Sequence, residues 1–257
     1  MVLSFISKKD RSNLINQTVS LNVGITKSFP CSYINDQEER LLMLVEPEIN
    51  APAYYYSLIE NGFRRSGDQV YRPHCENCQA CQSLRIAVNA FIPSRSQKRL
   101  LNKNKHFSVK ITQAHKPNYF DLYQKYIEQV HADGVMYPTS TQQYDQFINS
   151  SWNSPLFIEV YDQNKLISVS ITDQIKNGSK TLWSAFYCFY DPDYRSFSLG
   201  KYAVLTQLRL AKTSHIDWLY LGYYIEKCKK MNYKTQFNPH QRFIDGQWLS
   251  FNTKNES

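Results

Sequence analysis

The segment LFIEVYDQNKLISVSITDQIKNGSKTLWSAFYCFY, residues 156–190, decides the fold of this chain. Its apolar runs are rich in β-branched and aromatic residues, a composition typical of strands. The predicted strands cover residues 156–161, 166–171 and 181–190. Turn sequences at 162–165 and Asn177-Gly178 separate them. Because short turns join antiparallel neighbours, the segment predicts three antiparallel strands in a row.

The sequence before and after these three strands predicts further helices and one more strand. Apolar residues at helical spacing predict helices at 117–131, 140–150, 199–212 and 223–231. A short apolar run predicts a strand at 218–221. The order α-α-β-β-β-α-β-α implies one right-handed β-α-β crossover, so the fold class is α+β. We expect a smaller N-terminal α+β domain at 1–112, with a helix at 50–62 and a strand at 82–88, and a second domain at 113–257.

Composition excludes several functions. The chain has 257 residues, of which 42% are hydrophobic, so a folded core is expected. The net charge of +8 indicates an acidic partner such as nucleic acid, a membrane surface or an acidic peptide. No two of the eight glycines are closer than five residues, which excludes a G-x-G-x-x-G dinucleotide turn. Asp68-Gln69 follow Gly67 where a P-loop requires Lys and Ser or Thr.

The chain also lacks the patterns of membrane insertion and export. No apolar run approaches the roughly 20 residues that span a bilayer. Residues 1–6 lack the basic region and long apolar core of a signal peptide. We therefore expect a cytoplasmic protein whose cysteines are reduced, catalytic or bound to metal.

Cys75-x-x-Cys78-x-x-Cys81 is the strongest local motif. Three thiols at this spacing can turn toward one point, as in zinc and iron–sulfur sites. Cys31 is the expected fourth ligand, with His74 as the next candidate. The alternative is a set of reduced thiols in a small core.

A basic stretch covers residues 94–116, with seven positive residues and no Asp or Glu. Arg95, Arg99 and Lys103 fall at i, i+4 and i+8, on one face of a helix, and Lys98 lies between them. Such a face is suited to a phosphate backbone. A solvated helix without a partner is the other interpretation.

Residues 195–202 lie between a predicted strand and a predicted helix. The free backbone N–H groups at a helix start attract anions. The spacing Arg195-x-x-Ser198-x-Gly200 resembles the phosphate-binding turn of GNAT-type N-acyltransferases, although Ser198 is equally suited to be a helix cap. Residues 183–224 also contain 12 aromatic residues, some of which are expected to line a pocket or stack on a base.

Several motifs in order resemble the arginyl-tRNA–protein transferase family, and the short length and cysteine motif are similar to its bacterial branch. The motifs are FPCSY (29–33), GFRRSG (62–67), YRPHCENCQAC (71–81), PSRSQ (93–97), HADGVM (131–136), YDP (190–192), SLGKY (198–202) and LYLGY (219–223). The resemblance implies a GNAT-like domain after an N-terminal domain. It also implies transfer of leucine from leucyl-tRNA to the N-terminal amine of proteins that begin with Asp or Glu, which marks them for N-degron degradation.

From this reaction we predict a role for each candidate residue. The transfer itself requires no cofactor, because an aminoacyl ester is already reactive. The predicted roles are Asp133 and His131 in catalysis, Arg64 and Arg65 on the acidic side chain, Trp183 and Tyr220 in the leucyl pocket, Arg95, Lys98, Arg99, Lys103, Arg195, Ser198, Leu199, Gly200 and Tyr202 on the tRNA, and Cys31, Cys75, Cys78 and Cys81 on a metal.

Other interpretations of the same motifs remain open. Arginyl-tRNA is a possible donor for the same chemistry. A non-catalytic tRNA-binding protein would explain the charge, and an iron–sulfur sensor would explain the cysteines. A coenzyme A-dependent acetyltransferase would explain the predicted sheet and the 195–202 turn. Label transfer from leucyl-tRNA to an Asp-initiated peptide separates the leucyltransferase hypothesis from these alternatives.

Overall fold

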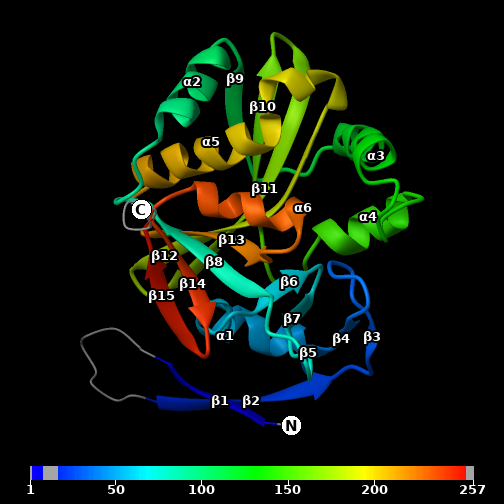
Figure 1. Ribbon diagram of the computed structural model, residues 1–257, viewed down its shortest axis with the longest axis vertical. Helices are drawn as coiled ribbons and strands as arrows, with labels where there is room; N and C mark the ends of the chain where they lie inside the picture. Colours follow the sequence, from blue (N-terminus) through cyan, green and yellow to red (C-terminus); the bar gives the residue numbers. More distant parts are fainter. Residues whose placement is uncertain (1, 8–16, 253–257) are drawn as a thin grey trace.

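The computed structural model describes residues 2–7 and 17–252 of the chain. In this part of the chain the largest sheet has eight strands, in the order β15-β14-β8-β13-β12-β11-β10-β9 (Figure 1). The strands are β8 (Gln82–Ala87), β9 (Ser108–Thr112), β10 (Leu156–Asp162), β11 (Lys165–Asn177), β12 (Lys180–Tyr190), β13 (Trp218–Tyr224), β14 (His240–Ile244) and β15 (Gln247–Phe251). Each pair of neighbours is antiparallel except β12 and β13, which are parallel.

The three central strands confirm the predicted meander. β10 pairs with β11 and β11 with β12, across the two predicted turns. Gly178 has a φ of 59°, a value that glycine adopts without strain in the turn between β11 and β12. β11 is longer than predicted, because a bulge after Ile171 shifts the register and lets polar residues up to Asn177 continue the pairing.

The N-terminal half forms a second, five-stranded sheet that the sequence did not indicate. Its order is β1-β2-β5-β7-β6, and a short hairpin of β3 and β4 lies apart from it. These strands are β1 (Val2–Ser7), β2 (Gln17–Ile25), β3 (Phe29–Pro30), β4 (Glu38–Glu39), β5 (Leu41–Leu44), β6 (Arg64–Ser66) and β7 (Gln69–Pro73). The boundary predicted at 112 falls after β8 and β9, and both of these strands pair within the large sheet. The large sheet therefore crosses that boundary.

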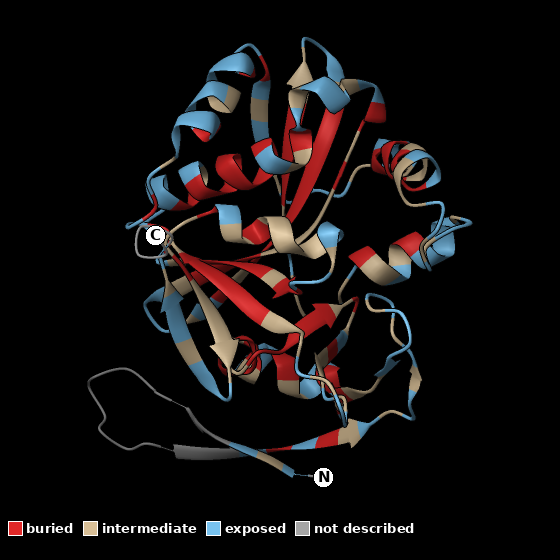
Figure 2. Cartoon of the chain, viewed as in Figure 1, coloured by how far each residue is buried: buried red, intermediate tan, exposed pale blue. Residues whose placement is uncertain are grey.

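Helices cover both faces of the large sheet, and buried residues follow these contacts (Figure 2). On one face, α5 packs on β8, β12 and β13 through residues such as Leu205, Trp183 and Leu219. On the other face, α1 packs against Leu182 and Tyr220, and α3 and α4 pack on β10, β11 and β12. The helices are α1 (Pro47–Glu60), α2 (Arg95–Lys103), α3 (Asn118–Val130), α4 (Thr141–Ile148), α5 (Leu199–Thr213) and α6 (Lys229–Asn232), with 3-10 turns η1 (Pro192–Phe197) and η2 (Tyr233–Gln236).

The helix predicted at 223–231 is wrong. β13 continues to Tyr224, because a bulge at Gly222, whose φ is 77°, returns Tyr223 and Tyr224 to pairing with Ser83 and Gln82. Only α6 remains helical in that segment, and η2 follows it directly. In residues 2–7 and 17–252, no helix combines the length and the apolar character needed to span a bilayer.

Candidate functional site

The large sheet opens between its two parallel strands. β12 and β13 pair only at Trp183–Leu219 and Ser184–Tyr220, although both strands run on in the same direction. Beyond this point residues 185–188 of β12 are only half-buried, which is unusual for a strand in the middle of a sheet. In sheets with parallel strands, ligands bind outside the carboxyl ends of such strands. The opening is therefore the first candidate for a substrate site.

The start of α5 lies at the carboxyl end of β12. Lys201 and Tyr202 donate the first helical hydrogen bonds, both to the carbonyl of Ser198, so the N–H groups of Leu199 and Gly200 precede them. These N–H groups carry the positive end of the helix dipole. Ser198 makes no side-chain cap; its backbone is left-handed, with φ and ψ of 49°. Ser198 is therefore the N-cap residue of α5 by position, as the alternative interpretation predicted, although its side chain makes no capping hydrogen bond.

The basic helix α2 lies beside this turn. A capping box between Ser94 and Gln97 starts the helix, as the PSRSQ motif allows. At its other end, Lys103 Nζ donates to the carbonyl of Ser196 at 2.7 Å, and Asn104 Nδ2 donates to that of Phe197 at 2.9 Å. Arg95, Lys98, Arg99 and Lys103 are all exposed. The structure thus joins two predicted tRNA-contacting groups, α2 and the 195–202 turn, into one cationic surface.

Two of the predicted residues within that turn differ in accessibility. Arg195 is exposed, and its guanidinium donates to the carbonyl of Gln129 at the end of α3. Tyr202 is only 3% exposed and packs in the core with Phe107 and Leu199. Tyr202 therefore packs α5 against the core, and its buried ring is not available for the predicted contact with tRNA.

Arg65 has a partner within the protein. Its Nε donates to Asp173 Oδ2 at 2.8 Å and its Nη2 to Oδ1 at 2.7 Å, and both side chains have 0% exposure. Nη1 donates to the carbonyls of Gly67 and Ile148. Because the edge formed by Nε and Nη2 is occupied by Asp173 and the side chain is completely buried, Arg65 is not available to bind a substrate carboxylate. This corrects its predicted role on the acidic side chain.

Arg64, its neighbour on β6, is buried without such a partner. Its side chain lies over the rings of Tyr220 and Tyr223, at 5.3 and 5.6 Å. Nη1 donates to the carbonyl of Phe63, but Nε and Nη2 are buried and have no hydrogen-bond partner among the described residues. Burial, followed by the charge of Asp173, raises the pKa of the Tyr55 hydroxyl, against the smaller opposing effects of Arg65 and Arg64. This hydroxyl is also buried without a hydrogen-bond partner in the described part of the chain.

Lys234 is a second buried cation in the same place, and no sequence motif indicated it. It lies on η2, is 6% exposed, and donates from Nζ to the carbonyl of Tyr223 at 2.5 Å. Burial, and after it the charge of Arg64, lowers the pKa of Lys234 to about 7. Arg64 lies over the ring of Tyr223 and Lys234 binds the carbonyl of the same residue, so Tyr223 lies between the two side chains.

His131 and Asp133 follow α3 in an exposed turn. Asp133 is paired with Lys230 of α6, at 2.9 and 3.0 Å, and this contact lowers the pKa of its carboxyl. His131 Nε2 lies 3.0 Å from the Tyr126 hydroxyl. Burial, and then the Lys230 charge, lowers the pKa of His131, so its neutral form is favoured.

The predicted leucyl pocket of Trp183 and Tyr220 is wrong. Trp183 packs in the core under α5, whereas Tyr220 packs under α1 with Leu182. Trp183 pairs with Leu219, the neighbour of Tyr220, and successive residues of a strand point to opposite faces. The two rings therefore lie on opposite faces of the sheet.

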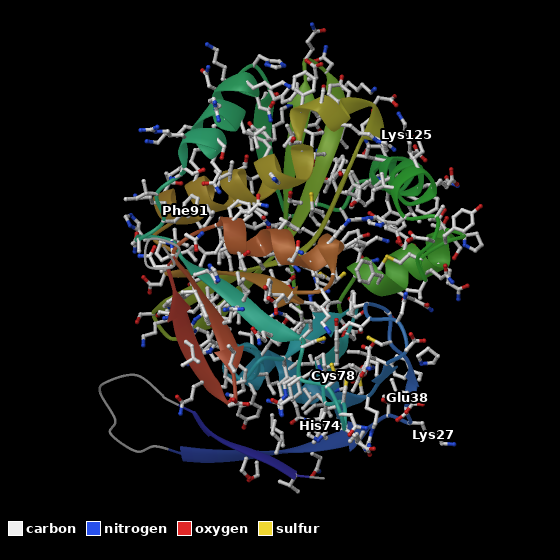
Figure 3. All side chains as sticks on the ribbon, in the orientation of Figure 1. Lys27, Glu38, His74, Cys78, Phe91 and Lys125 are labelled. Carbon is white, nitrogen blue, oxygen red and sulfur yellow. The ribbon has the colours of Figure 1, made fainter. Side chains whose placement is uncertain are left out.

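The predicted metal site at Cys31, Cys75, Cys78 and Cys81 is also not supported. Burial, followed by the charges of Cys75, Cys31, Glu39 and Cys78, raises the pKa of Cys81 to about 12, so these thiols lie in one region. Figure 3 places Cys78 and His74 beside the N-terminal sheet. Among the residues described, however, no three Cys, His, Asp or Glu side chains come together in a way that could hold a metal ion. The four thiols are suitable metal ligands by type, but their arrangement in the described chain does not form a metal site.

The remaining candidates form one connected region. Lys234 links Arg64 to η2, and α6 precedes η2 and reaches Asp133 through Lys230. In the view of Figure 1, α6 lies between α5 and β6. Tyr190 at the end of β12 contacts both Tyr126 of α3 and the start of α5 at Gly200. The two buried cations, the histidine turn and the start of α5 are therefore carried by neighbouring elements.

Comparison with known proteins gives full-length relatives. An aspartate/glutamate leucyltransferase from Aeromonas salmonicida is 45% identical over 94% of this chain and 100% of its own length. One from Aeromonas hydrophila is 44% identical with the same coverage, and one from Pseudoalteromonas atlantica is 44% identical over 91% of this chain and 99% of its own. Among solved structures, L-PGS from Bacillus licheniformis covers 58% of this chain and 48% of its own at 8% identity and a TM-score of 0.41, too distant to carry an argument.

The match to a protein family has two parts. Residues 29–99 match the N-terminal part of the arginine-tRNA-protein transferases, and residues 118–244 match their C-terminal part. The first range contains Arg64, and the second contains the strands that open and the start of α5. With these matches and with relatives above 40% identity over nearly its whole length, the chain belongs to the arginine-tRNA-protein transferase family.

Proposed function

We propose that this protein transfers leucine from leucyl-tRNA to the N-terminal amine of proteins that begin with Asp or Glu, and so marks them for N-degron degradation in the cytoplasm. The full-length relatives carry the name aspartate/glutamate leucyltransferase. The observation that carries the proposal is the buried guanidinium of Arg64, which has no carboxylate partner in the described chain and borders the opening of the sheet.

The reaction is the aminolysis of an ester. The peptide α-amine forms a bond to the leucyl carbonyl carbon, the bond from that carbon to the ribose oxygen breaks, and a proton passes from the amine to the leaving oxygen. Positioning supplies much of the acceleration, because the ester is already activated. In this proposal the neutral His131 accepts the proton of the amine, and Asp133 holds that turn against α6 through Lys230.

The aminoacyl end of the tRNA binds at the sheet opening in this proposal. Residues 113–257 act as a GNAT-like domain, in which β12, α5 and β13 form the crossover that places a helix start at the end of a parallel strand. The N–H groups of Leu199 and Gly200 bind a phosphate near the acceptor end. Arg95, Lys98, Arg99 and Lys103 hold the stem through its backbone. Half-buried residues of β12, such as Tyr187, replace Trp183 and Tyr220 around the leucyl group.

A matrix of donors and acceptors tests the function. Peptides that begin with Asp, Glu, Asn or Arg are each offered leucyl-, arginyl- and phenylalanyl-tRNA, and label transfer is measured. We expect transfer from leucyl-tRNA to the Asp and Glu peptides alone. Transfer from arginyl-tRNA instead would change the donor, and tRNA binding without any transfer would refute the enzyme.

A further inference from the structure

Arg64 and Arg65 are adjacent on β6, but in the described chain only one of them has a hydrogen-bond partner for the edge formed by Nε and Nη2. Arg65 uses the edge formed by Nε and Nη2 to hold both oxygens of Asp173. Arg64 has the same two nitrogens buried and without a partner in the described residues. An arginine edge of this kind matches the two oxygens of a carboxylate. The chain therefore contains both a filled carboxylate-binding edge and an empty one.

Lys234 provides a second donor near Arg64, because both side chains contact Tyr223. Its ammonium has three N–H groups and donates one to the carbonyl of Tyr223 and one to Met231 Sδ at 2.9 Å, which leaves a third for a ligand. A second charge buried near Arg64 is costly unless a negative charge is bound close by. Without one the pKa of Lys234 falls to about 7, and a bound carboxylate would favour its charged form. Within residues 2–7 and 17–252, however, none of the ion pairs includes Arg64 or Lys234.

We infer that Arg64 and Lys234 together bind the side-chain carboxylate of the acidic N-terminal residue, which makes Lys234 a specificity-determining residue. The inference rests on the proposed function and names the site that selects its acceptor. Arg64 holds both oxygens through Nε and Nη2, and Lys234 donates to one of them. A neutral Asn or Gln side chain offers a single acceptor oxygen and leaves both cations without a counter-charge, so it is rejected.

The location of this site favours the peptide over the tRNA. Arg64 and Lys234 are 6% exposed each, whereas the cations on α2 that suit a phosphate backbone are exposed. Lys234 lies on η2, directly after α6, and Lys230 of α6 contacts the turn that carries His131. A carboxylate bound here belongs to a residue whose amine is close to that turn. The charged side chain and the reacting amine of the peptide are thus placed by neighbouring parts of one segment.

The test uses the full chain and three single variants. Arg64→Gln and Lys234→Gln remove one charge each from the site but keep a donor for its backbone carbonyl. Lys229→Gln is the matched control, because it removes an exposed charge from the same segment. For each protein, kcat/KM is measured with Asp-initiated and Asn-initiated peptides at saturating leucyl-tRNA. The affinity for leucyl-tRNA is measured as well, and calorimetry follows the binding of the Asp peptide without tRNA.

We expect both site variants to lower kcat/KM for the Asp peptide by about 100-fold, while the rate with the Asn peptide and the affinity for leucyl-tRNA stay as in the unmodified chain. The control should match the unmodified protein in every measurement. The inference would be overturned if Lys234→Gln kept the full preference for Asp over Asn. It would also be overturned if this variant lost affinity for leucyl-tRNA and kept that preference, a result that would indicate a phosphate site. If the unmodified chain transfers no leucine, the proposed function fails, and calorimetry still shows whether the Asp peptide needs Lys234 to bind.

Discussion

Replacement of Asp173 by Asn is expected to destabilise the protein strongly, because it removes the only charged partner of Arg65 in the described chain. The pair is completely buried, and Asn153 Nδ2 also donates to Asp173 Oδ1 at 2.7 Å. The guanidinium of Arg65 has no route to water in the folded protein. Asp173→Asn therefore leaves a buried cation facing a neutral amide.

The expected loss in the free energy of unfolding is about 3–5 kcal/mol, the usual cost of removing one partner from a buried ion pair. For a chain of this length, each kcal/mol lowers the melting temperature by about 2–4 °C. A fall on the order of 10 °C follows. The pair Lys230–Asp133 gives a comparison, since its side chains are 54% and 71% exposed. Lys230→Gln should shift the melting temperature several-fold less, because solvent screens exposed pairs.

Thermal unfolding followed by circular dichroism measures both effects. The double variant Arg65→Met, Asp173→Leu should recover much of the lost stability, because it removes the two charges together. A melting temperature for Asp173→Asn as close to the unmodified value as that for Lys230→Gln would refute the reasoning. In that case Arg65 would regain its place as a candidate for substrate binding.

Three further predictions concern the carboxylate of Asp191, the basic helix α2 and the close approach of Gly67 to Gln146. Asp191 binds lysine ammonium groups, which lower the pKa of its carboxyl against the opposing effect of burial. The stabilisation by this carboxylate is complete above about pH 4–5, because the ordinary Asp pKa is about 3.9, and it is lost as the pH falls through the lower pKa of the folded protein. The stability of Asp191→Asn, measured by denaturation between pH 2 and 7, should therefore depend less on acid. Arg95→Ala with Arg99→Ala should weaken tRNA binding and lower the slope of log affinity against log salt by about 2, as filter binding at several salt concentrations would show. Gly67→Ala would put a Cβ 2.1 Å from the Gln146 carbonyl oxygen at a φ of 57°, and urea unfolding should show a loss of about 2–4 kcal/mol.

Local patterns predicted much of the large sheet and its helices. The apolar runs of 156–190 gave the three central strands, and the spacing of Arg95, Arg99 and Lys103 indicated the helix that the structure shows as α2. The helix predicted at 223–231 failed because the glycine bulge at 222 keeps the next two tyrosines in the sheet. A bulge depends on the partner strand, so apolar spacing within one segment cannot reveal it.

The candidate site was harder to predict, because its contacts join distant parts of the chain. The sequence motif placed Arg64 and Arg65 together, but only the fold shows that Asp173, 108 residues away, pairs with one of them. Lys234 carried no signal, since a lysine after a polar helix is usually exposed. Trp183 and Tyr220 were assigned to one pocket by their aromatic character, and the alternation of side chains in paired strands separates them.

The position of the two substrate-facing surfaces has a kinetic consequence. The cationic helix contacts the turn before α5, whereas the two buried cations lie on β6 and η2, so the two surfaces belong to different elements. If tRNA and peptide occupy them as proposed, neither has to leave before the other arrives. Initial rates measured against both substrates should then give intersecting double-reciprocal lines, the mark of a ternary complex, and no leucyl-enzyme should accumulate when peptide is withheld.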